Sequence, residues 1–163
     1  MATAFLFLEL EKQGQISGPA TSFGKEKGIP LISVTHELIS PRDVASGQAT
    51  GKIQSKPVTV VKETDATSAM MLQAMVTNEI VRKAEIKFFS TQNSGFRSGL
   101  DRNVYTITLV NGFITQAQFS FAEGQQDDKK QSMIDTISFV YSEIRWNWAD
   151  GDISVTHQPS RAT

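Results

Sequence analysis

The chain has 163 residues, of which 39% are hydrophobic and 20% charged, and its net charge at pH 7 is −1. This composition is that of an ordinary globular protein, and we expect residues 1–163 to form a single domain around one core. The near-zero charge provides no broad basic surface for nucleic acid, and the absence of cysteine excludes disulfides, thiolate metal sites and cysteine nucleophiles.

A short apolar run opens the chain at residues 4–8, with no basic residue before it and Glu9 directly after it. A secretory signal peptide has a basic start and a longer apolar region, so we interpret this run as the first strand. No stretch approaches the ~20 apolar residues that a membrane-spanning helix needs. We therefore expect no membrane insertion, and any export must leave the chain uncleaved.

Short alternating runs of valine, isoleucine, threonine and phenylalanine, separated by turn residues, are typical of antiparallel β structure. We expect strands at Ala4–Leu10, Gln15–Gly18, Pro30–Leu38, Gly51–Glu63, Lys83–Ser90, Val104–Asn111, Phe113–Ala122, Met133–Trp148 and Ile153–His157. So many short strands predict a mainly β protein, an antiparallel sandwich or barrel. A flexible tail is expected at about residues 157–163.

The helical pattern is confined to residues 66–78, which are rich in alanine, methionine and leucine. Thr64 or Asp65 can cap its start, and Asn78 can end it. Its larger apolar side chains fall on one stripe that we expect to pack on the barrel, namely Met71, Leu72, Met75 and Val76. A methionine-rich groove for a partner is the less favoured alternative.

The Asn111-Gly112 pair leaves two arrangements open. Both central residues of a type I′ turn need positive φ, so this pair favours a hairpin. The odd-numbered apolar positions from Tyr105 to Phe121 also fit one long strand that kinks at Gly112.

The strand at 133–148 changes phase along its length. Its apolar residues occupy odd positions up to Tyr141 and even positions from Ile144 onward. One extra residue near Ser142 and Glu143 would keep both sets on one face, so we predict a β-bulge there. Such a bulge bends a strand as a small barrel requires.

Catalytic and ligand motifs fail on their spacing. Gly47 to Lys52 resembles a phosphate loop, yet three residues instead of four separate the glycines, and Ile53 stands where a magnesium-binding hydroxyl belongs. The two histidines, His36 and His157, lie far apart in the chain with no carboxylate cluster beside them. Asp150-Gly151-Asp152 lacks the remaining ligands of a calcium loop. We expect no catalytic residue, no cofactor and no metal.

Trp146 and Trp148 leave a second function open. Exposed tryptophans could stack on a sugar or a base, and a monomeric β-barrel binding module for a sugar, lipid or oligonucleotide is the alternative function. Their phase with Ile144 favours burial in the core or at a subunit interface.

The segment from Pro41 to Asp65 and the elements after it resemble the Hcp family, the haemolysin-coregulated proteins of bacterial type VI secretion systems. The arm, at about residues 39–56, carries the family pattern at Pro41, Arg42, Asp43, Ser46, Gly47, Thr50, Gly51 and Lys52. Lys62, Glu63 and Asp65 are similar to its strand-to-helix junction. The strands near Ala84–Phe88, Tyr105–Leu109 and Ile137–Phe139 continue the match.

The resemblance implies a two-sheet antiparallel β-barrel flanked by one α-helix, with an extended loop arm. It implies a structural tube subunit, not an enzyme, that forms homohexameric rings stacked into a hollow tube. The implied partners are a spike protein trimer at the tip, a contractile sheath and small effectors in the lumen. The protein would reside in the bacterial cytoplasm before firing and then be secreted without a cleavable signal peptide.

The arm is too long for an ordinary connection and too short for a domain. We interpret it as a segment that reaches an adjacent ring or subunit. A structureless loop without a partner is the alternative.

Overall fold

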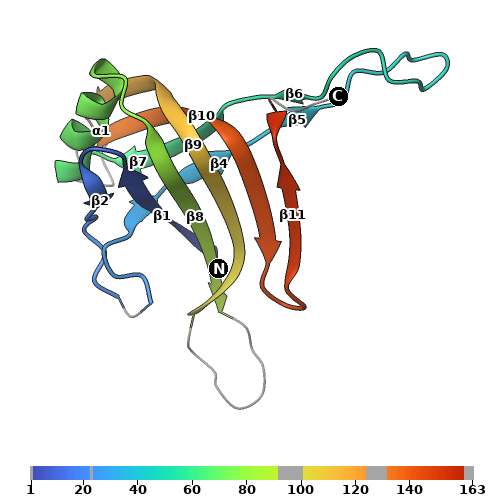
Figure 1. The fold of residues 1–163 in the computed structure, drawn as a ribbon. Coiled ribbons are helices and arrows are strands. Elements are labelled where there is room, and N and C mark those ends of the chain that lie inside the picture. The colour runs from blue at the N-terminus through green and yellow to red at the C-terminus, as the bar shows by residue number, and fades with distance from the viewer. Residues whose placement is uncertain (1, 23, 92–100, 124–131, 160–163) are drawn as a thin grey trace.

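The computed structural model describes residues 2–22, 24–91, 101–123 and 132–159. The elements are β1 (Ala2–Leu10), β2 (Gly14–Ile16), β3 (Ile29–Leu31), β4 (Ser33–Thr35), β5 (Leu38–Ile39), β6 (Gln54–Ser55), β7 (Val58–Glu63), α1 (Ala66–Val76), β8 (Val81–Thr91), β9 (Asp101–Ala122), β10 (Ser132–Trp148) and β11 (Ile153–His157). The protein is mainly β with one helix in the described residues, as predicted (Figure 1).

Nine of the described strands form one antiparallel sheet in the order β2-β1-β8-β9-β10-β7-β4, with β3 added on β1 and β11 on β10. The segment 29–35 joins the two sides of this order, because β3 pairs with β1 while β4 pairs with β7. Between them, the Ile32 amide donates to the Val61 carbonyl at 2.7 Å. The sheet therefore curls back on itself around a core of aliphatic side chains.

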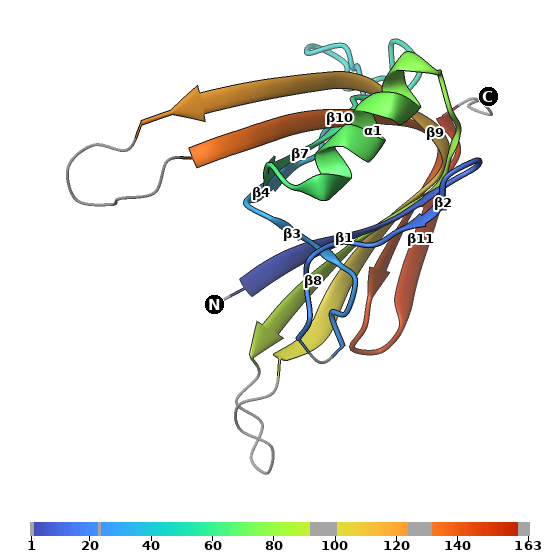
Figure 2. The same ribbon diagram turned by 90° about the vertical axis from the view of Figure 1, so that its left-hand side faces the viewer.

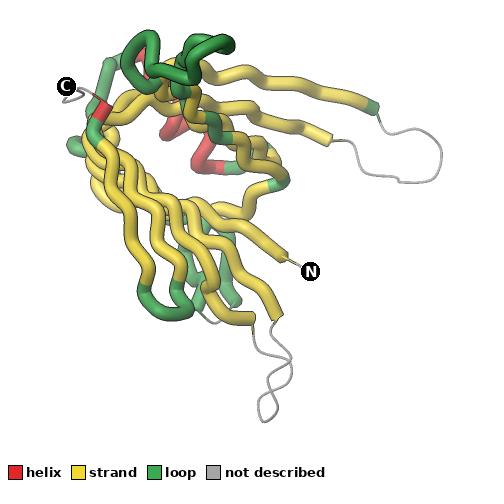
Figure 3. The backbone as a smooth tube through the Cα atoms, turned by 90° about the vertical axis from the view of Figure 1, so that its right-hand side faces the viewer, coloured by secondary structure: helices red, strands yellow, loops and turns green. Residues whose placement is uncertain are grey.

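The long strands β9 and β10 supply both layers of this curled sheet (Figure 3). The first half of β9 pairs with β8, and the second half of β10 pairs with β11. The first half of β10 pairs with β7, and the second half of β9 pairs with that same half of β10. Strands that bend from one layer into the other let a single sheet enclose the core.

β9 runs through Asn111-Gly112 without a break, so the long-strand alternative is confirmed and the hairpin is wrong. Asn111 adopts a φ of 49°, but its neighbour Gly112 stays paired with Val81 on one side and Tyr141 on the other. A Cβ on Gly112 would lie 2.0 Å from the Val140 carbonyl oxygen. Glycine is required here by the close approach of β10 and not by a turn.

The predicted bulge near Ser142 and Glu143 is wrong, because the irregularity between these strands lies elsewhere. The register between β9 and β10 shifts between Ser138 and Phe139, and the extra residue belongs to β9. Near the predicted site the two strands keep their register from Tyr141 to Glu143. The buried positions of β10 do change from odd to even numbers, as the sequence indicates. Those of β9 change at the same place, so neither strand has an extra residue relative to the other there.

Two predicted strands are subdivided. Pro30–Leu38 is split into β3, β4 and β5, because it changes partner from β1 to β7 to β6. Gly51–Glu63 contains β6 and β7, with Pro57 between them. Proline has no N–H for a ladder hydrogen bond, which explains the interruption.

The helix begins as predicted, with Asp65 as its N-cap and a capping box completed by Ser68. It lies at one end of the barrel, between the β9–β10 pair and the β1–β2 hairpin (Figure 2). The predicted apolar stripe is only partly correct, since Met71 and Ala74 are buried but Leu72 is 49% exposed and Val76 80% exposed. The buried face of the helix also includes Thr67 and Ser68 of its first turn. Because the helix packs through this face, Leu72 and Val76 point toward solvent.

The last strand, β11, reaches the first residue of the predicted tail at about residues 157–163. His157 ends β11 and pairs with Ile144. The Gln158 side-chain amide then donates to the Glu143 carboxylate at 2.8 Å. Residues 160–163 lie outside the described part of the chain.

Candidate functional site

The predicted arm is a narrow two-legged ribbon that projects away from the barrel (Figure 1). Its legs pair through β5 and β6, with Leu38 opposite Ser55 and Ile39 opposite Gln54. A further bridge joins Arg42 to Ala49 near the tip. The arm is thus a hairpin with some structure of its own and not an irregular loop.

Several of the predicted arm residues are brought together at the tip. The Asp43 amide donates to the Gln48 carbonyl at 2.8 Å, and the Thr50 amide donates to the Pro41 carbonyl at 2.9 Å. The tip turns at Gly47, whose φ of 70° suits glycine, and Arg42 Nη1 donates to the Gly47 carbonyl at 3.1 Å. Ser46, Gly51 and Lys52 are exposed along the same ribbon.

The tip also carries an apolar side chain with nothing to pack against. Val44 is fully exposed, and Ile53 on the returning leg is 44% exposed. Within the described part of the chain, the hydrogen bonds of residues 41–50 join residues of that stretch to one another. Among the described residues, the tip is therefore exposed and held together by hydrogen bonds within itself.

The root of the arm is attached to β10 by residues that the sequence analysis did not connect. The Tyr141 hydroxyl lies 3.2 Å from His36 Nε2 and 3.4 Å from the Lys56 carbonyl oxygen. Burial lowers the pKa of His36, whose ring lies 5.9 Å from that of Trp146. Burial also raises the pKa of Tyr141. The nearby Ser55 hydroxyl lowers this pKa in part, although its geometry is not that of a full hydrogen bond. His36 is therefore a half-buried residue with a hydrogen-bond partner, and no carboxylate cluster lies beside it in the described residues.

The strand-to-helix junction is a buried polar cluster under the start of α1. The Lys62 ammonium is completely buried and lies 3.1 Å from the Asp65 carboxylate and 3.4 Å from that of Asp135. It also donates to the Ser68 hydroxyl at 2.9 Å and to the Glu63 carbonyl at 2.8 Å. A buried ammonium with four oxygen partners is satisfied, and the cluster ties β7, α1 and β10 together.

Within this cluster, burial alone would raise the pKa of Asp65, but hydrogen bonds from Thr67 and the charge of Lys62 outweigh it and lower the pKa. The sequence pattern identified Lys62 and Asp65 but missed Ser68 and Asp135. Ser68 could have been found as the third residue of a capping box; Asp135 carries no local signal because it comes from a distant strand.

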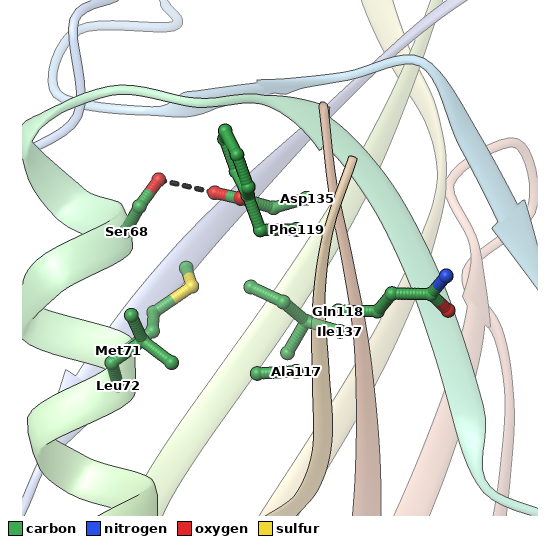
Figure 4. Close-up of a pocket in the computed structure, with 8 residues that line it drawn as sticks. All are labelled: Ser68, Met71, Leu72, Ala117, Gln118, Phe119, Asp135 and Ile137. Carbon is green, nitrogen blue, oxygen red and sulfur yellow. Dashed lines mark hydrogen bonds between the residues drawn. The ribbon is translucent and has the colours of Figure 1, made fainter. Parts of the chain in front are cut away.

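A shallow apolar groove of about 60 Å³ lies between α1 and the sheet (Figure 4). Met71 and Leu72 face Ala117 and Ile137 across it, and the hydrogen-bonded pair Ser68 and Asp135 lies at one end. The Ser68 hydroxyl donates its proton to the Asp135 carboxylate, so its polar atoms are engaged in the fold.

Paired residues on β8, β9, β10 and β11 form an apolar row across the sheet. Phe88 pairs with Tyr105, Tyr105 with Trp148, and Trp148 with Ile153. Trp146 packs against the core, but Trp148 is 46% exposed. The two tryptophans share the alternation of Ile144, as predicted, but Trp148 lies where the sheet extends beyond the core.

Neither catalysis nor metal binding gains support from the described residues. No group of three or more His, Cys, Asp or Glu side chains among them could hold a metal ion. The part of the chain that the structure describes also includes no helix long and apolar enough to cross a membrane.

Comparisons with known proteins agree with these features. The family model described as type VI secretion system effector, Hcp, matches residues 7–148. The Major exported protein of Pseudomonas aeruginosa is 29% identical over 158 residues, covering 90% of this chain and 89% of that protein.

Solved structures show the same fold. A crystal structure of an Hcp protein superposes with a TM-score of 0.85 at 21% identity, covering 98% of each chain. The secreted protein Hcp3 of Pseudomonas aeruginosa gives a TM-score of 0.77 at 22% identity, covering 97% of this chain and 98% of that one. These structures show the fold, and the family model, which matches most of the sequence, shows that the chain belongs to the Hcp family of type VI secretion system proteins.

Proposed function

We propose that the chain is a structural tube subunit that forms hexameric rings, which stack into a hollow tube. The observation that carries this proposal is the arm, a projecting hairpin whose exposed tip, in the described residues, forms hydrogen bonds within itself and not to the barrel. A protein that acts as a monomer gains nothing from ordering such a segment, whereas a subunit can use it to reach a neighbour.

The open edges and apolar surface of the sheet support ring formation. β11 is an outer strand beside β10 and exposes Ile153 and Val155. Such an edge must be blocked or must pair with a neighbour. One repeated contact between different faces of adjacent copies closes into a ring and leaves no edge in the plane.

The arm then has the role of joining rings along the tube axis. It projects beyond the sheet, so its tip can touch a copy that the sheet edges do not reach. Pro41, Arg42, Asp43, Ser46, Gly47, Thr50, Gly51 and Lys52 are the residues that we assign to this contact. Lys62, Glu63 and Asp65 hold the helix on the barrel and act on assembly indirectly.

In a working secretion system, the tube would carry small effectors in its lumen, bear a spike trimer at its tip and be propelled by a contractile sheath. The subunit would be made in the cytoplasm and exported with the tube. It would need no cofactor and would catalyse no reaction.

Two measurements on the purified protein test this function. Size-exclusion chromatography with light scattering should give the mass of six subunits, and electron microscopy should show rings with a central hole. A protein that remains monomeric at high concentration would refute the ring. In that case, a tryptophan fluorescence response to a sugar, lipid or oligonucleotide would instead support a binding module.

A further inference from the structure

We infer that the Tyr141 hydroxyl is the positioning group of the arm, which it ties to β10 at both legs. This inference rests on the proposed use of the arm in ring stacking. It assigns a role to one atom that lies outside the arm itself.

The two contacts of this hydroxyl reach opposite legs of the arm. His36 precedes β5 on the outgoing leg, and Lys56 follows β6 on the returning leg. The legs are joined to each other just above, where the Lys56 amide donates to the Glu37 carbonyl at 3.1 Å. One side chain of β10 therefore holds a closed loop of chain at its base.

The hydroxyl has one proton, which fixes the roles of its partners. It donates to the Lys56 carbonyl, which can only accept. It must then accept from His36, so His36 carries its proton on Nε2. Both bonds are made at once only when the two legs lie at their observed positions.

Side chains of the arm, β10 and the C-terminal segment surround the tyrosine ring. The His36 and Tyr141 rings meet edge to face, with centroids 6.2 Å apart. A small cavity of about 80 Å³ lies beside the ring and is lined by Ser55, Lys56, Pro57, Val140, Tyr141 and Pro159. The root is packed from both β10 and the C-terminal segment, whereas the tip is packed by neither.

A contact at the root controls the tip because the arm is long. Val44 lies five residues beyond β5, or about 17 Å at ~3.3 Å per residue. A tilt of about 10° at the root would move the tip by about 3 Å, which is enough to break a hydrogen bond or a van der Waals contact with another copy. Stacking of rings would then depend on a hydroxyl far from the stacking surface.

The experiment removes this hydroxyl by Tyr141→Phe in the full chain. Tyr105→Phe is the matched control, because Tyr105 is the other tyrosine and lies on β9 at the apolar row. Amide hydrogen exchange over residues 36–58 should be about fivefold faster in Tyr141→Phe and unchanged in Tyr105→Phe. Light scattering should still give six subunits, and tubes seen by electron microscopy should be fewer and shorter than those of the wild type.

Amide hydrogen exchange tests the tether at Tyr141, and tube formation tests the role of the arm in stacking. Unchanged exchange in the arm of Tyr141→Phe would overturn the tether whether or not rings stack. Faster exchange with normal tubes would overturn the positioning role in stacking. Normal tubes after removal of the arm tip would refute the stacking function itself and leave the exchange result standing.

A second variant covers the case in which Tyr141→Phe does not fold. His36→Phe removes the contact of the outgoing leg alone and keeps the Lys56 contact. Exchange should then rise on the side of residues 36–39 and stay unchanged near Lys56. Equal exchange on both legs would contradict a tether made of two separate contacts.

Discussion

Lys62 on β7 and Asp135 on β10, separated by 73 residues in the chain, lie 3.4 Å apart beneath the first turn of α1. Ser68 on the helix bonds to both of them. Three elements that are remote in the sequence therefore meet at one buried ammonium. Stability should depend on this contact more than on any surface ion pair.

Replacing Lys62 by Met should destabilise the fold by about 3–5 kcal/mol, because the carboxylates of Asp135 and Asp65 lose their buried cation. The measurement is the free energy of unfolding in urea at a fixed protein concentration. Lys83→Met is the matched control, since Lys83 is 48% exposed, and it should change stability by less than about 0.5 kcal/mol. Equal midpoints for the two variants would show that the cluster is not stabilising.

Gly112→Ala should cost at least about 2 kcal/mol, because the new Cβ would clash with backbone atoms of Val140 at the bend between the layers. Gly51→Ala is a fair control, as a Cβ there meets no atom within 4 Å. Thermal or urea unfolding of both variants checks the difference. If Gly112→Ala were as stable as Gly51→Ala, the strands could move apart freely at the bend.

The acid stability of the protein should depend on Glu79, a carboxylate buried beside the β1–β2 turn. Its carboxylate accepts hydrogen bonds from the backbone amides of Lys12 and Gln13 and from the Gln13 side-chain amide. Burial alone would raise the pKa of Glu79, but these hydrogen bonds outweigh it and lower the pKa below the ordinary 4.5. A lowered pKa stabilises the fold above pH 4.5, and the contribution is lost as pH falls through the folded value.

Glu79→Gln should therefore destabilise the protein at neutral pH by about 1–3 kcal/mol, since a neutral amide with one acceptor oxygen replaces a carboxylate with two. It should also flatten the loss of stability below pH 4.5. Unfolding curves between pH 3 and pH 7 for both proteins provide the test. Parallel curves would mean that Glu79 titrates normally in the folded protein.

Deleting Ser46 to Gly51 should leave the barrel folded and hexameric, because in the described residues the hydrogen bonds of the arm tip stay within the tip. Stacking of rings and secretion should be strongly impaired. Circular dichroism and light scattering check the fold and the ring, and electron microscopy and a secretion assay check the tube. Secretion at the wild-type level would remove the arm from the stacking contact.

Local patterns were sufficient for the element types in most of the described chain. Alternation predicted the β strands, and residues 66–78 predicted a capped helix, which the structure ends at Val76; both signals depend on neighbours a few residues apart. The arm was recognised from its family pattern between Pro41 and Lys52. Its hairpin pairing was not predicted, since the bridge from Arg42 to Ala49 has no strong sequence signal.

Long-range pairing was decided only by the tertiary structure. Asn111-Gly112 is compatible with a turn or a bend, and the choice came from the approach of Val140 on β10. Leu72 fits the apolar stripe of α1 by spacing, yet the helix rests on Met71 and Ala74.

The sequence by itself determined that this is a mainly β protein with one capped helix and an arm of the Hcp pattern, because those features lie in short segments. The tertiary structure decided which partners those segments meet. Asp135 under Lys62 and Tyr141 at the root of the arm are joined to their partners by folding, across distances at which no local pattern carries information.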